Sequence, residues 1–141
     1  MHKNSIYSNK HSPDIDSLIS RYHVIRRQPP GEQSDEELFE VVNSIAMLFA
    51  KEGFAYKALS WLKEAEPYTL SRPRLKIILN NNYACVYKQQ NLYEQAIHHL
   101  KESEQVLLNS KSTSTQGRRY DRLLIDCWLN LTAICSGKGL H

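Results

Sequence analysis

Apolar residues recur every three to four positions along most of the chain, and this spacing predicts amphipathic α-helices. The breaks between the apolar stretches contain proline, glycine, asparagine or runs of serine and threonine, which favour turns and loops. No stretch shows the strict apolar–polar alternation of a half-buried β-strand. The six predicted helices span about residues 13–27, 34–51, 54–66, 73–90, 93–108 and 118–136. The pattern therefore predicts an all-α fold.

Several of the predicted helix boundaries contain residue types with known effects on the backbone. Ser34 followed by Glu37 has the spacing of a capping box, which predicts that Ser34 caps the second helix. Gly53 and Asn91 tolerate left-handed backbone angles, so we expect each to end the helix before it. Pro67 lacks a backbone N–H and is expected to stop the third helix.

A repeat of small residues relates two of the predicted helix pairs. Ala46 and Ala58 of the first pair recur as Ala84 and Ala96 in the second, and both alanines are displaced along the chain by the same offset. Small side chains at a contact let two helix axes approach closely, while larger neighbours fill the groove on either side. Thr132 holds the equivalent position in the last predicted helix, after a somewhat longer interval. One helical hairpin is thus used twice and begun a third time.

This spacing of small and large residues resembles the tetratricopeptide repeat. The resemblance covers about residues 35–141, with two complete repeats and the first helix of a third. It implies a right-handed α-solenoid of antiparallel helix pairs over residues 34–141, preceded by a tail of residues 1–33 with one short amphipathic helix. The repeat offset exceeds the usual ~34 residues. A generic helical bundle whose small residues recur by chance is the alternative.

The resemblance also implies a concave groove lined by the first helix of each repeat. Its candidate residues are Asn43, Met47, Asn81, Asn82, Cys85, Lys88, Leu129 and Asn130. A side-chain amide both donates and accepts hydrogen bonds, so asparagines in a groove can hold the backbone of an extended peptide. Hydration, or hydrogen bonding between neighbouring helices, is the alternative use of these amides. The cationic clamp with which family members hold chaperone C-termini looks absent, since Asn82 alone matches it.

Positive charge is concentrated where the predicted first helices of the second and third repeats begin. The net charge of the whole chain is only +3. The residues of this basic edge are Arg72, Arg74, Lys76, Arg118, Arg119 and Arg122. Helix N-termini add positive potential there, so an acidic peptide, a phosphate or RNA could bind by charge, but the favoured interpretation is an edge that is merely solvated. Because aromatic residues are not interleaved with these cations, nucleic acid is not the expected partner.

The sequence ends soon after the last predicted helix, where the second helix of a third repeat is expected. The last helix would then expose an apolar face formed by Leu124, Trp128 and Leu131. Exposed faces of this kind usually mark an interface. We expect either a fragment of a longer array or a chain whose C-terminal helix is covered, by a second copy or another protein in a homo- or hetero-oligomer or by the 13–27 helix folding over it.

The sequence contains no motif typical of an enzyme or a metal site. Phosphate-binding glycine loops, nucleophile elbows and zinc-protease motifs do not occur. His98 and His99 are adjacent on a predicted helix and point about 100° apart, so they are not expected to chelate one metal ion. The three cysteines lack the Cys-x-x-Cys spacing and are typical of free thiols in a reducing compartment.

No apolar stretch is long enough for a membrane span, and no apolar signal segment follows Met1. These observations favour a cytoplasmic protein. We therefore expect a non-enzymatic protein–protein interaction scaffold without metal or cofactor, which binds a peptide or helix of a partner protein in its groove. The alternative is a structural subunit that assembles through its terminal helix and basic edge.

Overall fold

The computed structural model describes residues 13–110 together with residues 125, 129 and 132, and nearly all of these residues are helical. No β-strand occurs among them, so the predicted all-α class is confirmed. The elements are α1 (Pro13–Arg26), α2 (Glu32–Lys51), α3 (Ala55–Ala65), the short 3-10 helix η2 (Glu66–Thr69), α4 (Pro73–Gln89) and α5 (Tyr93–Ser110). In this part of the chain, no helix combines the length and the hydrophobicity needed to cross a membrane.

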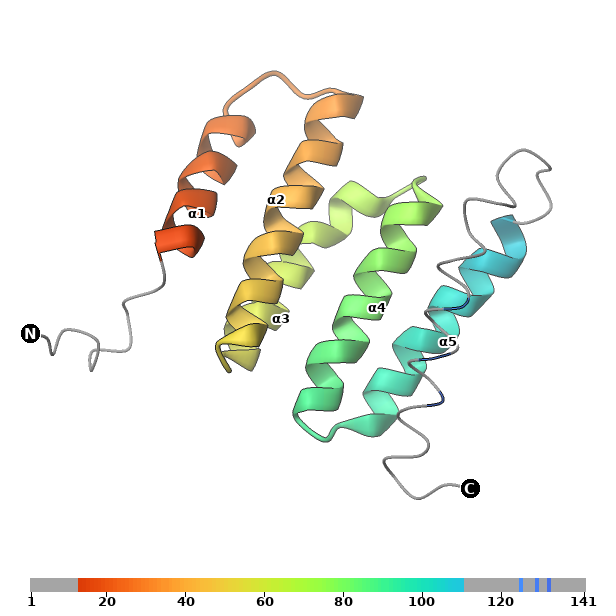
Figure 1. Ribbon diagram of the computed structural model, residues 1–141. Coiled ribbons are helices and arrows are strands. Elements are labelled where there is room, and N and C mark those ends of the chain that lie inside the picture. The colour runs from red at the N-terminus through yellow and green to blue at the C-terminus, as the bar shows by residue number, and fades with distance from the viewer. Residues whose placement is uncertain (1–12, 111–124, 126–128, 130–131, 133–141) are drawn as a thin grey trace, which may run out of the picture.

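The helices pack as two hairpins with α1 at one end. The α2–α3 and α4–α5 pairs make the most extensive helix contacts, and α4 also packs against both α2 and α3. Figure 1 shows α2 and α4 next to each other, with α3 behind them, α1 beside α2 and α5 beside α4. The second hairpin therefore lies alongside the first.

The two hairpin turns have the same hydrogen bonds at equivalent positions of the repeat. In the first turn the Phe54 amide donates to the Phe49 carbonyl at 2.9 Å, and in the second the Leu92 amide donates to the Tyr87 carbonyl at 2.9 Å. Gly53 and the equivalent Asn91 have φ angles of +89° and +62°. This is the pattern of a Schellman helix end, in which one left-handed residue turns the chain out of the helix. Both residues therefore end their helices as predicted.

The four repeated alanines are buried in the structure. Ala46, Ala58 and Ala96 are fully buried, and Ala84 is 1% exposed. Ala46 and Ala58 belong to the main core, whereas Ala84 and Ala96 form a second cluster with Leu100. The expectation that these small residues lie at helix contacts instead of facing water is confirmed.

Most of the apolar core lies between α1, α2, α3 and the near side of α4. Ile15, Tyr22 and Ile25 of α1 are part of this main cluster together with Val42 and Leu62. At about 25 cal/mol per Å² of buried apolar surface, three buried side chains of this size make a large contribution to stability. Helix α1 is therefore packed into the same core as the first hairpin.

The start of α2 differs from the prediction. The helix begins at Glu32, with Gly31 as its N-cap, so the predicted capping box of Ser34 with Glu37 is wrong. Ser34 lies in the first turn instead. Its hydroxyl accepts a hydrogen bond from the Gly31 amide at 2.9 Å and donates to the Gly31 carbonyl at 2.8 Å. The serine still satisfies polar groups at the helix end, but from inside the helix.

The chain after α3 is also helical for longer than the pattern indicated. The α-helix ends at Ala65, before Pro67 as predicted, but residues Glu66–Thr69 continue as the 3-10 helix η2. Pro67 lies in the first turn of η2. Backbone N–H groups there have no acceptor within the helix, so the missing N–H of proline costs no hydrogen bond. The Thr69 hydroxyl donates to the Glu66 carbonyl at 2.8 Å and stabilises this short turn.

Candidate binding surface

The outward faces of α2 and α4 meet at a pair of asparagine side chains. The Asn82 amide nitrogen donates to the Asn43 side-chain oxygen at 2.6 Å, and both side chains are half-buried. The structure thus brings together two predicted groove residues. They form the hydrogen bond between neighbouring helices that the sequence left open as the alternative to binding a peptide. One hydrogen bond occupies part of each amide. The Asn82 oxygen and the Asn43 nitrogen have no other partner among the described residues.

A cavity of about 280 Å³ lies beside this asparagine pair. We call it the α2–α4 cavity, and its lining residues are Phe39, Glu40, Asn43, Ser44, Arg74, Leu75 and Ile78. Its apolar floor is small, because Phe39 and Leu75 are buried and Ile78 is half-buried, and most of its accessible lining is polar. Glu40, Ser44 and Arg74 are exposed at its rim. Ligand pockets for whole small molecules are usually about 300–1,000 Å³, so this cavity suits one or two side chains of a larger partner.

The other predicted groove residues extend the same face toward the C-terminal end of α4. Met47, Asn81 and Cys85 are half-buried, and Lys88 is exposed. The Asn81 side-chain oxygen is buried without a hydrogen-bond partner, which costs about 1–3 kcal/mol. Burial raises the pKa of the Cys85 thiol, and nearby Lys88 opposes this only in part. Cys85 is therefore a protonated, free thiol at neutral pH.

The predicted residues of the C-terminal part are only partly described. Leu129 and Ile125, four residues apart, both have helical backbone. Leu129 is 62% exposed and Ile125 is 52% exposed. The predicted residues Asn130, Leu124, Trp128, Leu131, Arg118, Arg119 and Arg122 lie outside the described residues.

The described cations of the basic edge have different neighbours. Arg72 pairs with Asp35 at 3.6 Å and donates to the Tyr68 carbonyl at 3.4 Å, so it joins the start of α4 to the first turn of α2. Arg74 lies at the rim of the α2–α4 cavity. Lys76 lines a separate cavity next to α5. Of these three, Arg74 alone lies in the predicted groove region.

The separate cavity combines several polar side chains with a mainly apolar accessible lining, and it was not predicted from the sequence. It has a volume of about 250 Å³, and we call it the α4–α5 cavity. Its lining residues are Glu66, Thr69, Leu70, Lys76, Leu79, Asn80, Tyr83, His99 and Glu102. The Asn80 side-chain oxygen lies 2.8 Å from the His99 Nδ1, and the Tyr83 hydroxyl donates to the Glu66 carboxylate.

Burial at this cavity shifts the pKa values of two stacked rings. The His99 ring is stacked on Tyr83, with centroids 4.5 Å apart, and also on Tyr87. Burial lowers the pKa of His99, which the Glu102 carboxylate opposes in part, so the ring is neutral at pH 7. Burial raises the pKa of Tyr83, and the hydrogen bond to Glu66 raises it further. The cavity therefore holds an un-ionised phenol and a neutral imidazole.

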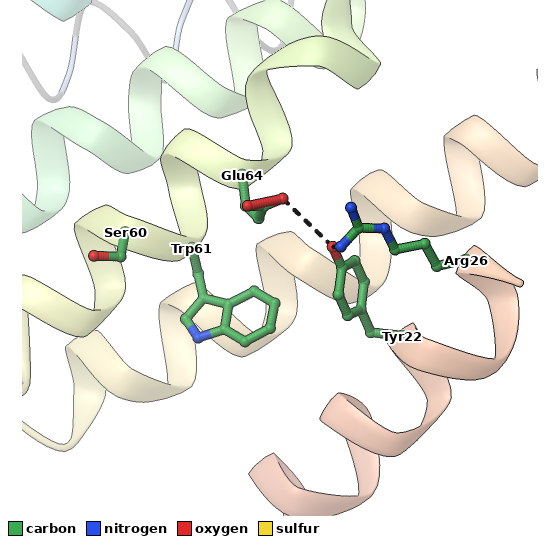
Figure 2. Close-up of a pocket in the computed structure, with 5 residues that line it drawn as sticks. All are labelled: Tyr22, Arg26, Ser60, Trp61 and Glu64. Atoms are coloured by element: carbon green, nitrogen blue, oxygen red, sulfur yellow. Dashed lines mark hydrogen bonds between the residues drawn. The ribbon is translucent and has the colours of Figure 1, made fainter.

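A third cavity lies between α1 and α3. It has a volume of about 220 Å³ and is lined by Tyr22, Arg26, Ser60, Trp61 and Glu64. We call it the α1–α3 pocket. Figure 2 shows Tyr22 and Arg26 of α1 facing Trp61 and Glu64 of α3, with Ser60 beyond the indole. The Tyr22 and Trp61 rings are nearly perpendicular, with centroids 5.3 Å apart.

The α1–α3 pocket and the α4–α5 cavity share a sequence signal that pattern reading overlooked. Trp61 and Glu64 of α3 are equivalent to His99 and Glu102 of α5 at the same offset that relates the repeated alanines. Each cavity is thus lined by a ring and a glutamate from the second helix of its hairpin.

The comparisons with known proteins add no family to this description. No protein-family model, curated protein or solved structure matches the chain. In the described parts of the chain, histidine, cysteine and acidic residues form no group of three or more that could hold a metal ion.

Proposed function

We propose that the chain is a non-enzymatic protein–protein interaction scaffold that binds a peptide or helix of a partner protein on the α2–α4 face. The observation that carries the proposal is the α2–α4 cavity, in which an apolar floor lies beside a half-satisfied pair of asparagine amides. The floor accepts an apolar side chain, and the free amide groups bond the backbone on either side of it. An extended peptide presents both features together, which makes it the preferred form of the ligand.

The proposal includes a tetratricopeptide-type right-handed solenoid. Two observations support it: the hydrogen bonds of the two hairpin turns are equivalent, and the four repeated alanines are buried at helix contacts. A regular stack of such hairpins would place α2 and α4 on one concave side. A reducing, cytoplasmic environment is part of the same proposal, and the free thiol of Cys85 is consistent with it.

The charges at the rim indicate how a peptide would be oriented. Arg74 has no ion pair among the described residues, whereas Arg72 is paired with Asp35. A peptide whose apolar residue enters the cavity and whose acidic residue follows it would pair with Arg74. Ion pairs at a rim mainly change the association rate and the salt dependence of binding.

The test starts from a partner identified by affinity purification and a peptide mapped from it. Calorimetry on the wild type, Asn82→Ala and Arg74→Glu should show about tenfold weaker binding for Asn82→Ala, and for Arg74→Glu a weakening that diminishes as the salt concentration rises. Lys101→Glu makes the same charge change on an exposed residue of α5 that lines none of the three cavities, and should bind like the wild type. Unchanged affinity in both cavity variants would refute a ligand on this face.

The second candidate function is a structural subunit that assembles through its C-terminal helix and basic edge. It is favoured by Ile125 and Leu129, two exposed apolar residues four positions apart on helical backbone. Residues at this spacing share one helix face. Light scattering at increasing concentration tests this function: assembly should be abolished by Ile125→Glu, a change outside the groove candidates, and preserved in Asn82→Ala. The first function predicts that Asn82→Ala and Asn130→Ala lose ligand while the assembly state is unchanged.

A further inference from the structure

The α1–α3 pocket is a second surface with the composition of a ligand site, and it shares no lining residue with the α2–α4 cavity. Tyr22 is 2% exposed and forms a fixed inner wall. Trp61 is half-buried and stands nearly perpendicular to it, so the two rings form a corner that is open on the indole side. The indole N–H of Trp61 has no hydrogen-bond partner among the described residues.

The charged residues of the pocket are only weakly satisfied within the chain. Arg26 donates to the Tyr22 hydroxyl at 2.9 Å, and its other N–H groups have no acceptor in the described part of the structure. Glu64 accepts one long bond of 3.4 Å from the same hydroxyl. Neither charge has an ion-pair partner among the residues described. The remaining Arg26 N–H groups and the Glu64 carboxylate therefore lie at the same end of the pocket, where both side chains hydrogen-bond the Tyr22 hydroxyl.

This arrangement does not suit a ligand cation between the rings. The Arg26 guanidinium carbon already lies 5.7 Å from the centre of the Tyr22 ring, where a cation would bind an aromatic cage. A second cation at that position would be repelled by Arg26. The open indole face instead suits an uncharged ring whose neighbouring carbonyl groups accept hydrogen bonds.

Proline has both properties. Its ring packs flat on an aromatic side chain, its carbonyls are not occupied within a polyproline II helix, and such segments lose little conformational entropy on binding. Arg26 and the Trp61 indole N–H would donate to those carbonyls. The Glu64 carboxylate, which accepts only one long hydrogen bond from the described residues, would pair with a basic residue next to the prolines, in competition with Arg26 at the same hydroxyl.

We propose that the α1–α3 pocket binds a proline-rich segment of a partner protein, with a proline ring on Trp61 and a flanking basic residue on Glu64. This inference goes beyond the proposed function and does not depend on the α2–α4 face. It assigns the chain a second binding site on α1 and α3. These helices contribute no residue to the lining of the α2–α4 cavity.

The probe is a short capped polyproline peptide with one arginine at its end. Three counterparts accompany it: one with glutamate in place of arginine, one with glycine and serine in place of the prolines, and one with trimethyl-lysine and no proline. Affinity is measured by calorimetry on the full chain. The site is located by NMR from the indole N–H signal of Trp61, which is assigned by its loss in Trp61→Phe.

The arginine–proline peptide should bind and shift the Trp61 signal, whereas the glycine–serine peptide should not. Trp61→Phe should weaken binding about tenfold, because the larger ring supplies most of the contact surface. Glu64→Lys should weaken binding of the arginine peptide about tenfold, so that the glutamate peptide becomes the better ligand. Glu94→Lys makes the same charge change on an exposed residue of α5 outside the three cavities and should have no effect.

Three results would overturn the proposal: no shift of the Trp61 signal, equal binding of the glycine–serine peptide, or tighter binding of the trimethyl-lysine peptide. Glu64 is exposed, so Glu64→Lys leaves the core intact even if Trp61→Phe destabilises the fold. Arg74→Glu distinguishes this site from the α2–α4 cavity: it should leave binding of the proline peptide unchanged. Loss of binding in Arg74→Glu would place the peptide on the other face and refute the inference.

Discussion

The α1–α3 pocket and the α4–α5 cavity are built on the same two repeat positions and differ in chemistry. Trp61 packs against a buried tyrosine of α1, whereas its equivalent His99 stacks on a buried tyrosine of α4 and bonds to Asn80. In both, the glutamate one turn later lies at the edge. The repeat thus determines where a cavity forms, while the neighbouring residues determine whether its ring packs on a tyrosine alone or also hydrogen-bonds to an asparagine.

The contrast continues into the core beneath each cavity. Ala65 of α3 and its equivalent Ser103 of α5 are both fully buried. The Ser103 hydroxyl donates to the Ile77 carbonyl at 3.2 Å, a bond that alanine does not need. The first hairpin is thus held mainly by apolar burial, and the second also relies on side-chain hydrogen bonds, whose net contribution is about 1 kcal/mol each.

The largest expected effect is a difference between Trp61 and His99 in their contribution to the free energy of unfolding. Trp61→Ala should lower the free energy of unfolding by about 3 kcal/mol, because it removes a large apolar side chain that packs against the main core. His99→Ala should cost about 1 kcal/mol, since it removes a smaller, neutral ring with one hydrogen bond. Urea unfolding followed by circular dichroism measures both. A larger loss for His99→Ala would show that the α4–α5 cavity is the more important of the two for stability.

The next effect concerns the turns that precede the two cavity-lining helices. Gly53→Ala should cost about 1 kcal/mol, because φ is +89° and only glycine adopts such angles without strain. A β-carbon at this position would meet nothing within 4 Å, so the cost is conformational and not steric crowding. The same urea titration should show that Asn91→Gly stabilises the chain by about 0.5 kcal/mol. A destabilising Asn91→Gly would mean that the Asn91 side chain matters more than its backbone angle.

Asn91 does have a side-chain role that bears on this outcome. The Tyr93 hydroxyl donates to the Asn91 side-chain oxygen at 2.9 Å in an exposed position. Exposed hydrogen bonds of this kind compete with water, so we expect the backbone effect to be larger. Tyr93→Phe is the matched control, because it removes this bond and leaves the turn unchanged.

The smallest expected effect is a dependence of stability on pH that His99 of the α4–α5 cavity should produce. The pKa of His99 in the folded chain lies below its ordinary value of 6.5, so the unfolded chain binds the proton more readily. The free energy of unfolding should therefore be highest above about pH 7 and should fall as the pH drops through the pKa of His99.

Urea unfolding of the wild type and His99→Gln at several pH values measures this dependence. The variant should show a flatter profile, while Trp61→Phe should retain the wild-type slope. Glu66, Glu102, Lys76 and His98 also lie near His99, but the variant changes none of them. An unchanged slope in His99→Gln would assign the pH dependence to those groups instead.

Much of the fold was predictable because local patterns determine it. Apolar periodicity predicted the described helices to within a few residues, and the left-handed residues Gly53 and Asn91 marked both hairpin turns. The predicted start of α2 was wrong because a serine can satisfy the helix end from either side of it, and the sequence motif does not distinguish the two. The burial of the repeated alanines followed from spacing alone.

The cavities were not predictable in the same way. Tyr22 and Trp61 are distant in sequence, so their contact depends on how α1 packs against α3, which no local pattern specifies. The run Asn80, Asn81 and Asn82 shows the same problem within one helix. Successive residues point about 100° apart, so Asn80 bonds to α5, Asn82 bonds to α2, and the buried Asn81 oxygen is unpaired. The sequence predicted amides on this helix but not their separate partners.

The packing of α1 has a practical consequence for anyone who truncates the chain. A shorter protein that starts at residue 34, the beginning of the predicted repeat domain, would lack Ile15, Tyr22 and Ile25. Their removal would uncover the apolar side of α2 and one face of Trp61. Solvent-exposed apolar surfaces of this type promote aggregation. Such a fragment would also have lost a wall of the pocket that it was made to study. The smallest useful piece therefore begins no later than Pro13.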